Sequence, residues 1–540
     1  MQPGRLVPLG LSTGKGLTMH TDDIIEDVGS MSRFQLLLLF LIIGSKVIHP
    51  WGMLMMSFTG VPPDFWWCDK NASVAPNGAM NYTHIQQCPS LDSNTTCTFV
   101  YSQEKDTVIN EWNLVCEQSD VKPFITAVQM GGVVLGAALG GQSGDAIGRK
   151  KTYYLSLLLN VFFNLAAAFS VSWQMFTVLR FFIGAMVGSL LVVSFSYYME
   201  FIGKYWRPMT GTMPFWPVGS ALFAMTCWLC PNWSYLHIIT AMIHVPFLFG
   251  WFVVPESMRW LAAHGHLEEA EKVVDQMARY NGTKKPVNTA AILKQVAEEE
   301  LRGRESNRKY TYLDLYRPWS LCWKSFIIQI VWLNVSSVYY GISFGVGRLT
   351  GNLYLNMFLV AIIDIPGKLV VFFLSNKIGR RWTAFIFFAL ASCAAFAVVF
   401  VTSVDAAVGE SVTTVLALVC RLGVAAAWAC HLVFASETYP TVIRNLGYGA
   451  ANTAARVGSI VSPYIFTMGG DDLMPPFLIV GISMFLCTLL SLVMKETMGV
   501  PLEDTTANTS KKPCNSDVMV GYKSIPLKKD EDNGLLDEEV

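Results

Sequence analysis

The chain has 540 residues, of which 52% are hydrophobic, 13% aromatic and only 15% charged. Soluble domains usually contain about 45–50% apolar and about 25% charged residues, so this composition argues against a soluble enzyme. Lys and Arg (39) nearly balance Asp and Glu (40), and the formal net charge of -1 gives no reason to expect nucleic acid as a partner. The mean hydropathy of +0.40 points to the lipid bilayer as the solvent.

Uncharged apolar runs recur along the whole chain. A helix needs about 20 mostly apolar residues to cross a bilayer, and several of these runs are that long. The sequence therefore predicts an all-α membrane protein with twelve transmembrane helices. The predicted spans lie near 34–56, 124–142, 153–170, 173–198, 209–229, 236–254, 323–342, 352–374, 382–401, 412–434, 446–467 and 475–494.

The orientation follows from the basic residues of the short loops, because cytoplasmic loops are enriched in Lys and Arg. Basic residues follow spans 2, 4, 8 and 10, at 149–151, at Lys204 and Arg207, at 377–381 and at Arg444. These loops and both termini are therefore predicted to be cytoplasmic. Lys and Arg are absent from loops 171–172, 230–235, 402–411 and 468–474, on the opposite side.

A long loop at 57–123 lies on the predicted external side. Four cysteines in an oxidising compartment predict two disulfides, with three pairings open. Three glycosylation sequons in the same loop agree with this side. The cysteines are Cys68, Cys88, Cys97 and Cys116, and the sequon asparagines are Asn71, Asn81 and Asn94.

The chain divides into five predicted parts. Residues 1–33 form a cytoplasmic N-terminal segment, and 34–254 form a first six-helix half that includes the external loop. The charged segment 255–322 predicts a cytoplasmic linker with surface helices, because apolar residues recur there at helical spacing. A second six-helix half follows at 323–494, and the polar tail 495–540 is predicted to be disordered and cytoplasmic.

Three cytoplasmic loops of the first six spans recur in the second six, at offsets of 231, 237 and 240 residues. Such a repeat predicts two six-helix halves in parallel orientation. An acid that faces Arg or Lys at a helix end can form a charge-assisted contact that breaks when the halves move. The alternative is that these charges only fix orientation. The predicted gating residues are Asp145, Arg149, Glu200, Arg207, Arg380 and Arg444, with Arg180 and Arg421 at the starts of spans 4 and 10.

The chain resembles the organic ion transporter family of the major facilitator superfamily. The resemblance lies in these loops and in segments 110–116, 255–261 and 437–447. The resemblance implies the major facilitator fold and transport of a small organic ion: a cation, an anion, or carnitine or another zwitterion. Ala146 departs from the family pattern, where a basic residue is usual. Asn376 also departs, because an acid is expected there in the second half.

Ionisable residues inside spans are costly and are functional candidates by default. Asp364 and Lys368 are four residues apart and so can pair on one helix face, either as a structural bridge or at a binding site. Arg456 resembles the arginine of anion and carnitine carriers, where cation carriers tend to have an acid, and a guanidinium favours carboxylates. The charged substrate-binding candidates are Arg456, Lys368, Asp364, Lys46 and Glu437.

Aromatic side chains in spans 5 and 7 complete the predicted pocket. Their rings could stack on a flat substrate or hold an ammonium group by cation–π attraction, although packing against lipid or core is the alternative for any one of them. These residues are Trp332, Tyr339, Tyr340, Phe215 and Trp216.

The sequence contains no phosphate-binding loop, no HExxH motif and no GxSxG motif, so it predicts no cofactor, no metal site and no enzyme. We expect a plasma-membrane transporter of carboxylate-bearing zwitterions or anions that works by alternating access. Transport is either facilitative or an exchange, with a counter-ion or coupling ion as a further partner. The alternatives are a polyspecific organic cation transporter and a receptor-like protein that has lost transport.

Overall fold

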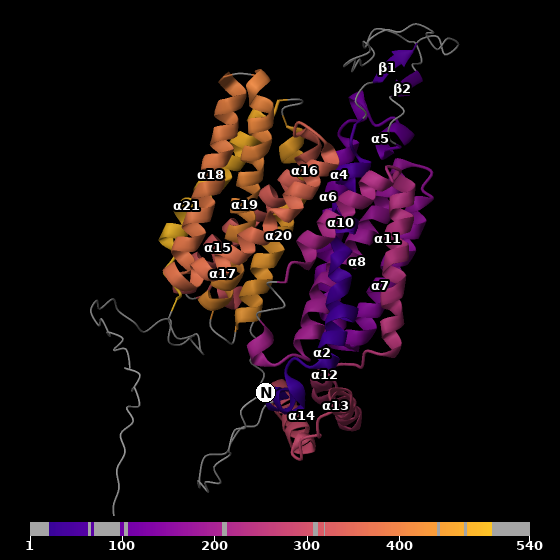
Figure 1. Cartoon of the computed structure of the whole chain (residues 1–540). Helices are drawn as coiled ribbons and strands as arrows, with labels where there is room; N and C mark the ends of the chain where they lie inside the picture. Colours follow the sequence, from indigo (N-terminus) through magenta and orange to yellow (C-terminus); the bar gives the residue numbers. More distant parts are fainter. Residues whose placement is uncertain are drawn as a thin grey trace, which may run out of the picture.

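The computed structural model describes residues 21–62, 66–69, 98–101, 106–207, 213–305, 312–317, 319–404, 406–439, 443–468 and 472–498. It consists of two helical bundles that stand side by side (Figure 1), here called the first half and the second half.

The first half begins with an irregular span. Its chain passes through a π-helical turn and a 3-10 turn before it continues as α-helix at His49 and Pro50. The other spans of this half are more regular (Figure 1). Its elements are α2 (Arg33–Leu38), η1 (Leu39–Ile43), η2 (Gly44–Val47), α3 (His49–Leu54), α4 (Met56–Thr59), α6 (Val121–Ile147), α7 (Arg149–Ala168), α8 (Trp173–Met199), η4 (Lys204–Trp206), α10 (Phe215–Leu229), α11 (Trp233–Leu248) and η5 (Phe249–Phe252).

The second half repeats this plan. Its span near 352–374 is divided at Ile363 into two helices, the second of which contains Pro366. The elements are η6 (Tyr312–Leu315), α15 (Trp319–Phe344), η7 (Gly345–Arg348), α16 (Leu353–Ile362), α17 (Asp364–Ile378), α18 (Arg380–Val404), α19 (Ala406–Thr438), α20 (Arg444–Thr467) and α21 (Met474–Val493).

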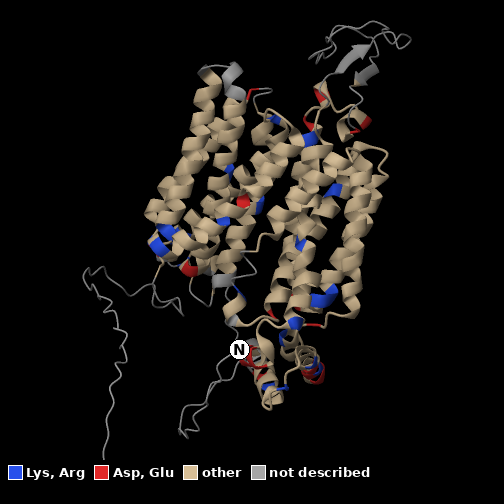
Figure 2. Cartoon of the chain, in the orientation of Figure 1, with Lys and Arg blue, Asp and Glu red and all other residues tan. Residues whose placement is uncertain are grey.

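Nine helices in the described ranges are long and apolar enough to cross a membrane. Three spans complete the twelve. The helix α10 is apolar but shorter, while α7 and α20 carry polar residues such as Asn160, Asn164 and Arg456 within their length. Figure 2 shows that few charged residues occur along the middle of the bundles compared with their ends. The apolar composition of the nine helices and the scarcity of charge along the middle of the bundles both agree with the high cost of placing a charge in lipid.

Two groups of elements outside the bundles mark their opposite ends (Figure 1). One end, called the hairpin end, carries the antiparallel strands β1 (Trp66–Asp69) and β2 (Thr98–Tyr101), the only strands in the described part of the chain. The helix α5 (Val108–Glu111) and the turn η3 (Cys116–Gln118) follow. The other end, called the linker end, carries α1 (Thr21–Gly29), α12 (Met258–Ala263), α13 (Leu267–Asn281) and α14 (Thr289–Glu305).

Cys116 is disulfide-bonded. The sequon residues and the side chains of the other three external cysteines lie outside the described residues, so the pairing and the glycosylation stay predictions. The limits of the five predicted parts likewise stay predictions.

Close helix contacts hold each half together. In the first half, α6 and α8 pack so tightly that a Cβ atom on Gly188 would collide with the carbonyl oxygen of Val133. Small residues allow this approach, which is the usual way in which helices associate in lipid.

The two halves meet at the hairpin end. The Ser57 hydroxyl of α4 donates to the carbonyl oxygen of Ser343 in α15 at 3.1 Å. One residue further along α4, the ring of Phe58 stacks on Tyr354 of α16 with centroids 5.9 Å apart. These four residues define what we call the seam.

The N-terminal helix α1 is fixed to the linker end. Its apolar residues Ile24, Ile25 and Val28 are fully buried. The Asp22 carboxylate accepts hydrogen bonds from Arg207, after α8, and from Arg259 in α12. Burial raises the pKa of Asp22, but the two guanidinium groups outweigh it and hold the pKa below its usual value of 3.8. The carboxylate is therefore ionised at neutral pH and joins three segments.

We expect Asp22→Asn to lower the free energy of unfolding by about 1.5–3 kcal/mol, because charged hydrogen bonds are lost. Thermal unfolding of the purified protein measures this, with Asp27→Asn on the exposed face of α1 as the control. A carboxylate with a lowered pKa contributes stability that is present above its unfolded pKa and is lost as pH falls through the folded pKa. The difference between wild type and Asp22→Asn should thus vanish only in acid below about pH 4. Equal stability of both variants at neutral pH would contradict this role.

Candidate functional site

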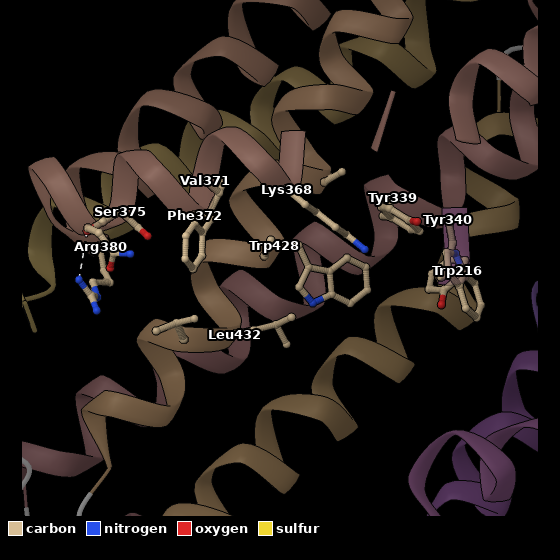
Figure 3. A pocket seen from close by; sticks show the side chains of 14 residues that line it. Trp216, Tyr339, Tyr340, Lys368, Val371, Phe372, Ser375, Arg380, Trp428 and Leu432 are labelled. Atoms are coloured by element: carbon tan, nitrogen blue, oxygen red, sulfur yellow. Dashed lines mark hydrogen bonds between the residues drawn. The ribbon is translucent and has the colours of Figure 1, made fainter. Parts of the chain in front are cut away.

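A cavity of about 420 Å³ lies between α10 of the first half and the helices of the second half. Figure 3 shows its lining from close by. Aromatic and aliphatic side chains dominate, with a few polar groups, as is usual in small-molecule sites. The lining residues are Trp216, Tyr339, Tyr340, Lys368, Val371, Phe372, Ser375, Asn376, Arg380, Ala425, Trp428, Ala429, Leu432 and Val433.

The charge of this lining is positive. Lys368 and Arg380 are its charged residues, and none of the described lining residues is Asp or Glu. Arg380 is paired with Glu437, outside the cavity, at 3.2 Å. The Lys368 ammonium points into the cavity toward Trp428 (Figure 3), and no hydrogen bond or ion pair involves it in the part of the chain that the structure describes. Within these described residues, Lys368 is thus the free cation of the site.

Asp364 lies one helical turn before Lys368 but does not pair with it. Its carboxylate accepts two hydrogen bonds from Arg421 of α19, both at 3.1 Å, and a third from the Tyr339 hydroxyl at 2.8 Å. Asp364 and Arg421 are almost completely buried. The predicted local pair is wrong because a planar guanidinium can bind both carboxylate oxygens at once, which a lysine ammonium cannot do.

Arg421 also fixes the helix that carries the aromatic wall. Its Nη1 atom donates to the carbonyl oxygen of Tyr339 at 2.5 Å and to the Ser343 hydroxyl at 2.9 Å. All three guanidinium nitrogens therefore have partners. The cavity wall at Tyr339 is held at both its backbone and its hydroxyl.

Trp428 also lines the cavity, although it was not among the residues predicted from the sequence. Its ring meets Tyr339 edge-on, with centroids 5.1 Å apart, and Tyr340 at 6.3 Å. It lies seven residues after Arg421, so the two side chains share one face of α19. This seven-residue spacing from Arg421 was the signal in the sequence that could have identified Trp428 as a cavity residue.

The remaining predicted substrate residues lie outside the lining. Lys46 lies over the ring of Phe195 in the first half, 5.0 Å from its centroid. Trp332 is buried and packs edge-on against Tyr448, in the same helix as the half-buried Arg456. Phe215 begins α10 and packs against a core cluster at the linker end. The structure thus brings together Lys368, Tyr339, Tyr340 and Trp216, and it separates them from Lys46, Arg456, Trp332, Phe215 and Glu437.

The predicted gating residues of the first half form a charge cluster within that half. Arg149 donates to Glu200 at 3.1 Å and also to Asp145. The carboxylate of Glu256 accepts from the backbone N–H groups of Arg149, at 3.0 Å, and Lys150, at 3.1 Å, and so caps the start of α7. Acids at a helix N-terminus are favourable because its first N–H groups lack partners.

The second half repeats this cluster. Arg380 donates to Glu437 at 3.2 Å, and Glu496 accepts from the backbone N–H groups of Arg380, at 2.8 Å, and Arg381, at 3.0 Å. The side chain of Arg444 lies outside the described residues. These contacts stabilise each helix end within its own half, and among the described residues neither cluster joins one half to the other. Glu200 contacts Arg149, and Arg207 contacts Asp22 of the helix α1.

No group of three or more His, Cys, Asp or Glu side chains that could hold a metal ion occurs in the ranges that the structure describes. The cavity residues point to binding through charge and aromatic contact.

Comparisons with known proteins agree with this architecture. Residues 85–508 match the family model of the sugar (and other) transporters. The chain is similar to solute carrier family 22 member 15-like of Xenopus laevis, with 33% identity over 74% of this chain and 81% of the relative. It is also similar to organic cation/carnitine transporter 2 of Homo sapiens (30% identity, 80% and 76%) and to the organic cation transporter protein of Drosophila melanogaster (28%, 92% and 96%).

Solved structures show the same fold. The inward-open conformation of the xylose transporter XylE from E. coli superposes with a TM-score of 0.63 at 16% identity, over 88% of this chain and all of that one. The prediction of twelve helices in two six-helix halves is confirmed. The chain belongs to the sugar (and other) transporters of the major facilitator superfamily and, within them, to the organic ion transporters of solute carrier family 22. It is therefore a multi-pass membrane transporter.

The buried pair generates a stability prediction. Asp364→Asn leaves the Arg421 guanidinium buried without a counter-charge, which should cost about 3–5 kcal/mol and reduce the amount of folded protein in the membrane. The yield of folded protein from membranes and thermal unfolding measure the loss.

The double variant Asp364→Asn with Arg421→Gln removes both charges and should recover most of the folded protein, since neutral replacement of a buried pair is often tolerated. If the single variant is as stable as wild type, or if the double variant is worse than the single one, the pair does not have this role.

Proposed function

We propose that this chain transports small organic zwitterions or anions across the plasma membrane by alternating access. The Lys368 ammonium carries the proposal, because it lies unpaired in an aromatic cavity whose described lining has no acid. A carboxylate would form a charge-assisted hydrogen bond there. A substrate with only positive charge would be repelled, and more strongly than in water because the surroundings have a low dielectric constant.

The aromatic wall favours a zwitterion among these substrates. The rings of Trp216, Tyr339, Tyr340 and Trp428 can hold an ammonium group by cation–π attraction while Lys368 holds the carboxylate. The relative named as organic cation/carnitine transporter 2 supports this interpretation, because carnitine is a zwitterion. The words "organic cation" in the names of this relative and of the Drosophila melanogaster relative keep a polyspecific organic cation transporter as the second candidate.

Alternating access requires that the seam open and close. The cavity lining extends to Arg380 at the linker end, whereas Ser57 and Ser343 join the halves at the hairpin end. We infer that in the described conformation the cavity opens toward the cytoplasm, with the β1–β2 hairpin outside the cell and both termini inside. Transport is facilitative or exchanges one organic ion for another, and no enzymatic activity is proposed.

One uptake experiment tests the substrate class. The full chain in proteoliposomes is given a quaternary amine, a carnitine-like zwitterion or an aromatic carboxylate, with and without sodium and at a clamped membrane potential. We expect saturable uptake and counterflow of the zwitterion or the carboxylate. Uptake of the quaternary amine alone would favour the organic cation transporter, and binding without flux would favour the receptor-like alternative.

Lys368→Gln should reduce kcat/KM for carboxylate substrates about 10- to 100-fold, because a charge-assisted hydrogen bond contributes about 1.5–3 kcal/mol. Lys377→Gln is the matched control, since Lys377 lies on the same helix, is exposed and does not line the cavity. Uptake relative to surface expression is measured for both. Equal carboxylate uptake by the two variants would remove Lys368 from the site.

A further inference from the structure

Arg180 is a second arginine that is fully buried inside the bundle. It lies on α8 of the first half and has 0% exposure. Its Nη2 atom donates to the carbonyl oxygen of Gly52 at 3.0 Å and to the side-chain oxygen of Gln129. The Nε and Nη1 atoms have no partner among the described residues, and none of the ion pairs in this part of the chain includes Arg180.

The second half contains the same arrangement with a different charge. Arg421 follows Arg180 by 241 residues and Asp364 follows Gln129 by 235, close to the offsets of the repeated loops. Each arginine also donates to a backbone carbonyl in the first span of its half, at Gly52 or at Tyr339. The chemical difference is that Arg421 meets a carboxylate and Arg180 meets an amide.

This difference leaves the first half with an uncompensated buried cation. A buried arginine inside a membrane protein is costly without a counter-charge, and Asp364 offsets that cost for Arg421. Gln129 supplies a hydrogen-bond acceptor but no negative charge. The ring of Phe176, 5.9 Å from the guanidinium carbon, adds only a weak attraction.

We propose that the first half binds a small monovalent anion of halide size at Arg180, where the anion serves as the counter-charge that Asp364 provides in the second half. The anion must be small because the side chain is fully buried and does not line the substrate cavity. The site is therefore separate from the cavity assigned to the organic substrate, and it does not depend on the identity of that substrate.

Chloride is the probe. The purified full chain in detergent is titrated with sodium chloride against sodium gluconate at constant ionic strength, and the Tm is recorded without substrate. We expect a saturable rise of Tm with chloride, because a ligand that binds only the folded state stabilises it. Bromide should give the same rise. If the Tm of the wild-type protein is the same in chloride and gluconate, the proposal is overturned, and this measurement needs neither a variant nor transport.

Gln129→Glu gives Arg180 a carboxylate of nearly the same size as the amide. This variant should be as stable in gluconate as the wild type is in chloride, and its Tm should no longer respond to chloride. Gln142→Glu, at an exposed position of the same helix, is the control and should keep the wild-type response. A chloride-induced rise of equal size in Gln129→Glu and wild type would reveal a general salt effect and would overturn the site. Because this Tm measurement requires no transport, a failure of the proposed transport function leaves the result interpretable.

Discussion

The cost of a charge inside the bilayer is the constraint on which this structure depends. Asp364 and Arg421 meet that constraint together, since each is almost fully buried and each is the other's counter-charge. The pair also positions the cavity wall, because Asp364 accepts from the Tyr339 hydroxyl and Arg421 donates to the Tyr339 carbonyl. Lys368, one turn further along the same helix, is then left without a partner among the described residues. The pairing of one acid thus determines which cation is left free in the cavity.

The helix α15 connects the cavity to the seam. Tyr339 lines the cavity, and its carbonyl oxygen accepts from both Arg421 and the Ser343 hydroxyl. The carbonyl oxygen of Ser343 in turn accepts from Ser57 of the other half. A movement that opens the seam therefore displaces a residue only one helical turn from the cavity wall. The helix offers a short physical route by which a ligand in the cavity can alter the contact between halves.

The spans, the repeat and most of the aromatic wall could be predicted from the sequence, because lipid demands long apolar runs and the repeat preserves loop chemistry. The charge partners could not. Local spacing pairs Asp364 with Lys368, but Arg421, 57 residues away, binds both carboxylate oxygens. Spacing alone likewise could not show that Arg207 contacts Asp22 from the N-terminal helix. Partners of this kind depend on how distant helices pack.

The two halves share a fold but contribute unequally to the site. Of the 14 described residues that line the cavity, Trp216 alone comes from the first half. The second half therefore supplies most of the contacts that a substrate in this cavity can make, together with the ion pair that fixes them. The first half has the buried arginine of the repeat without its acid. Both arginines bind a backbone carbonyl in the first span of their half. The two halves differ in charge, because the Asp364 carboxylate neutralises the buried cluster of the second half, whereas the Gln129 amide leaves that of the first half positive.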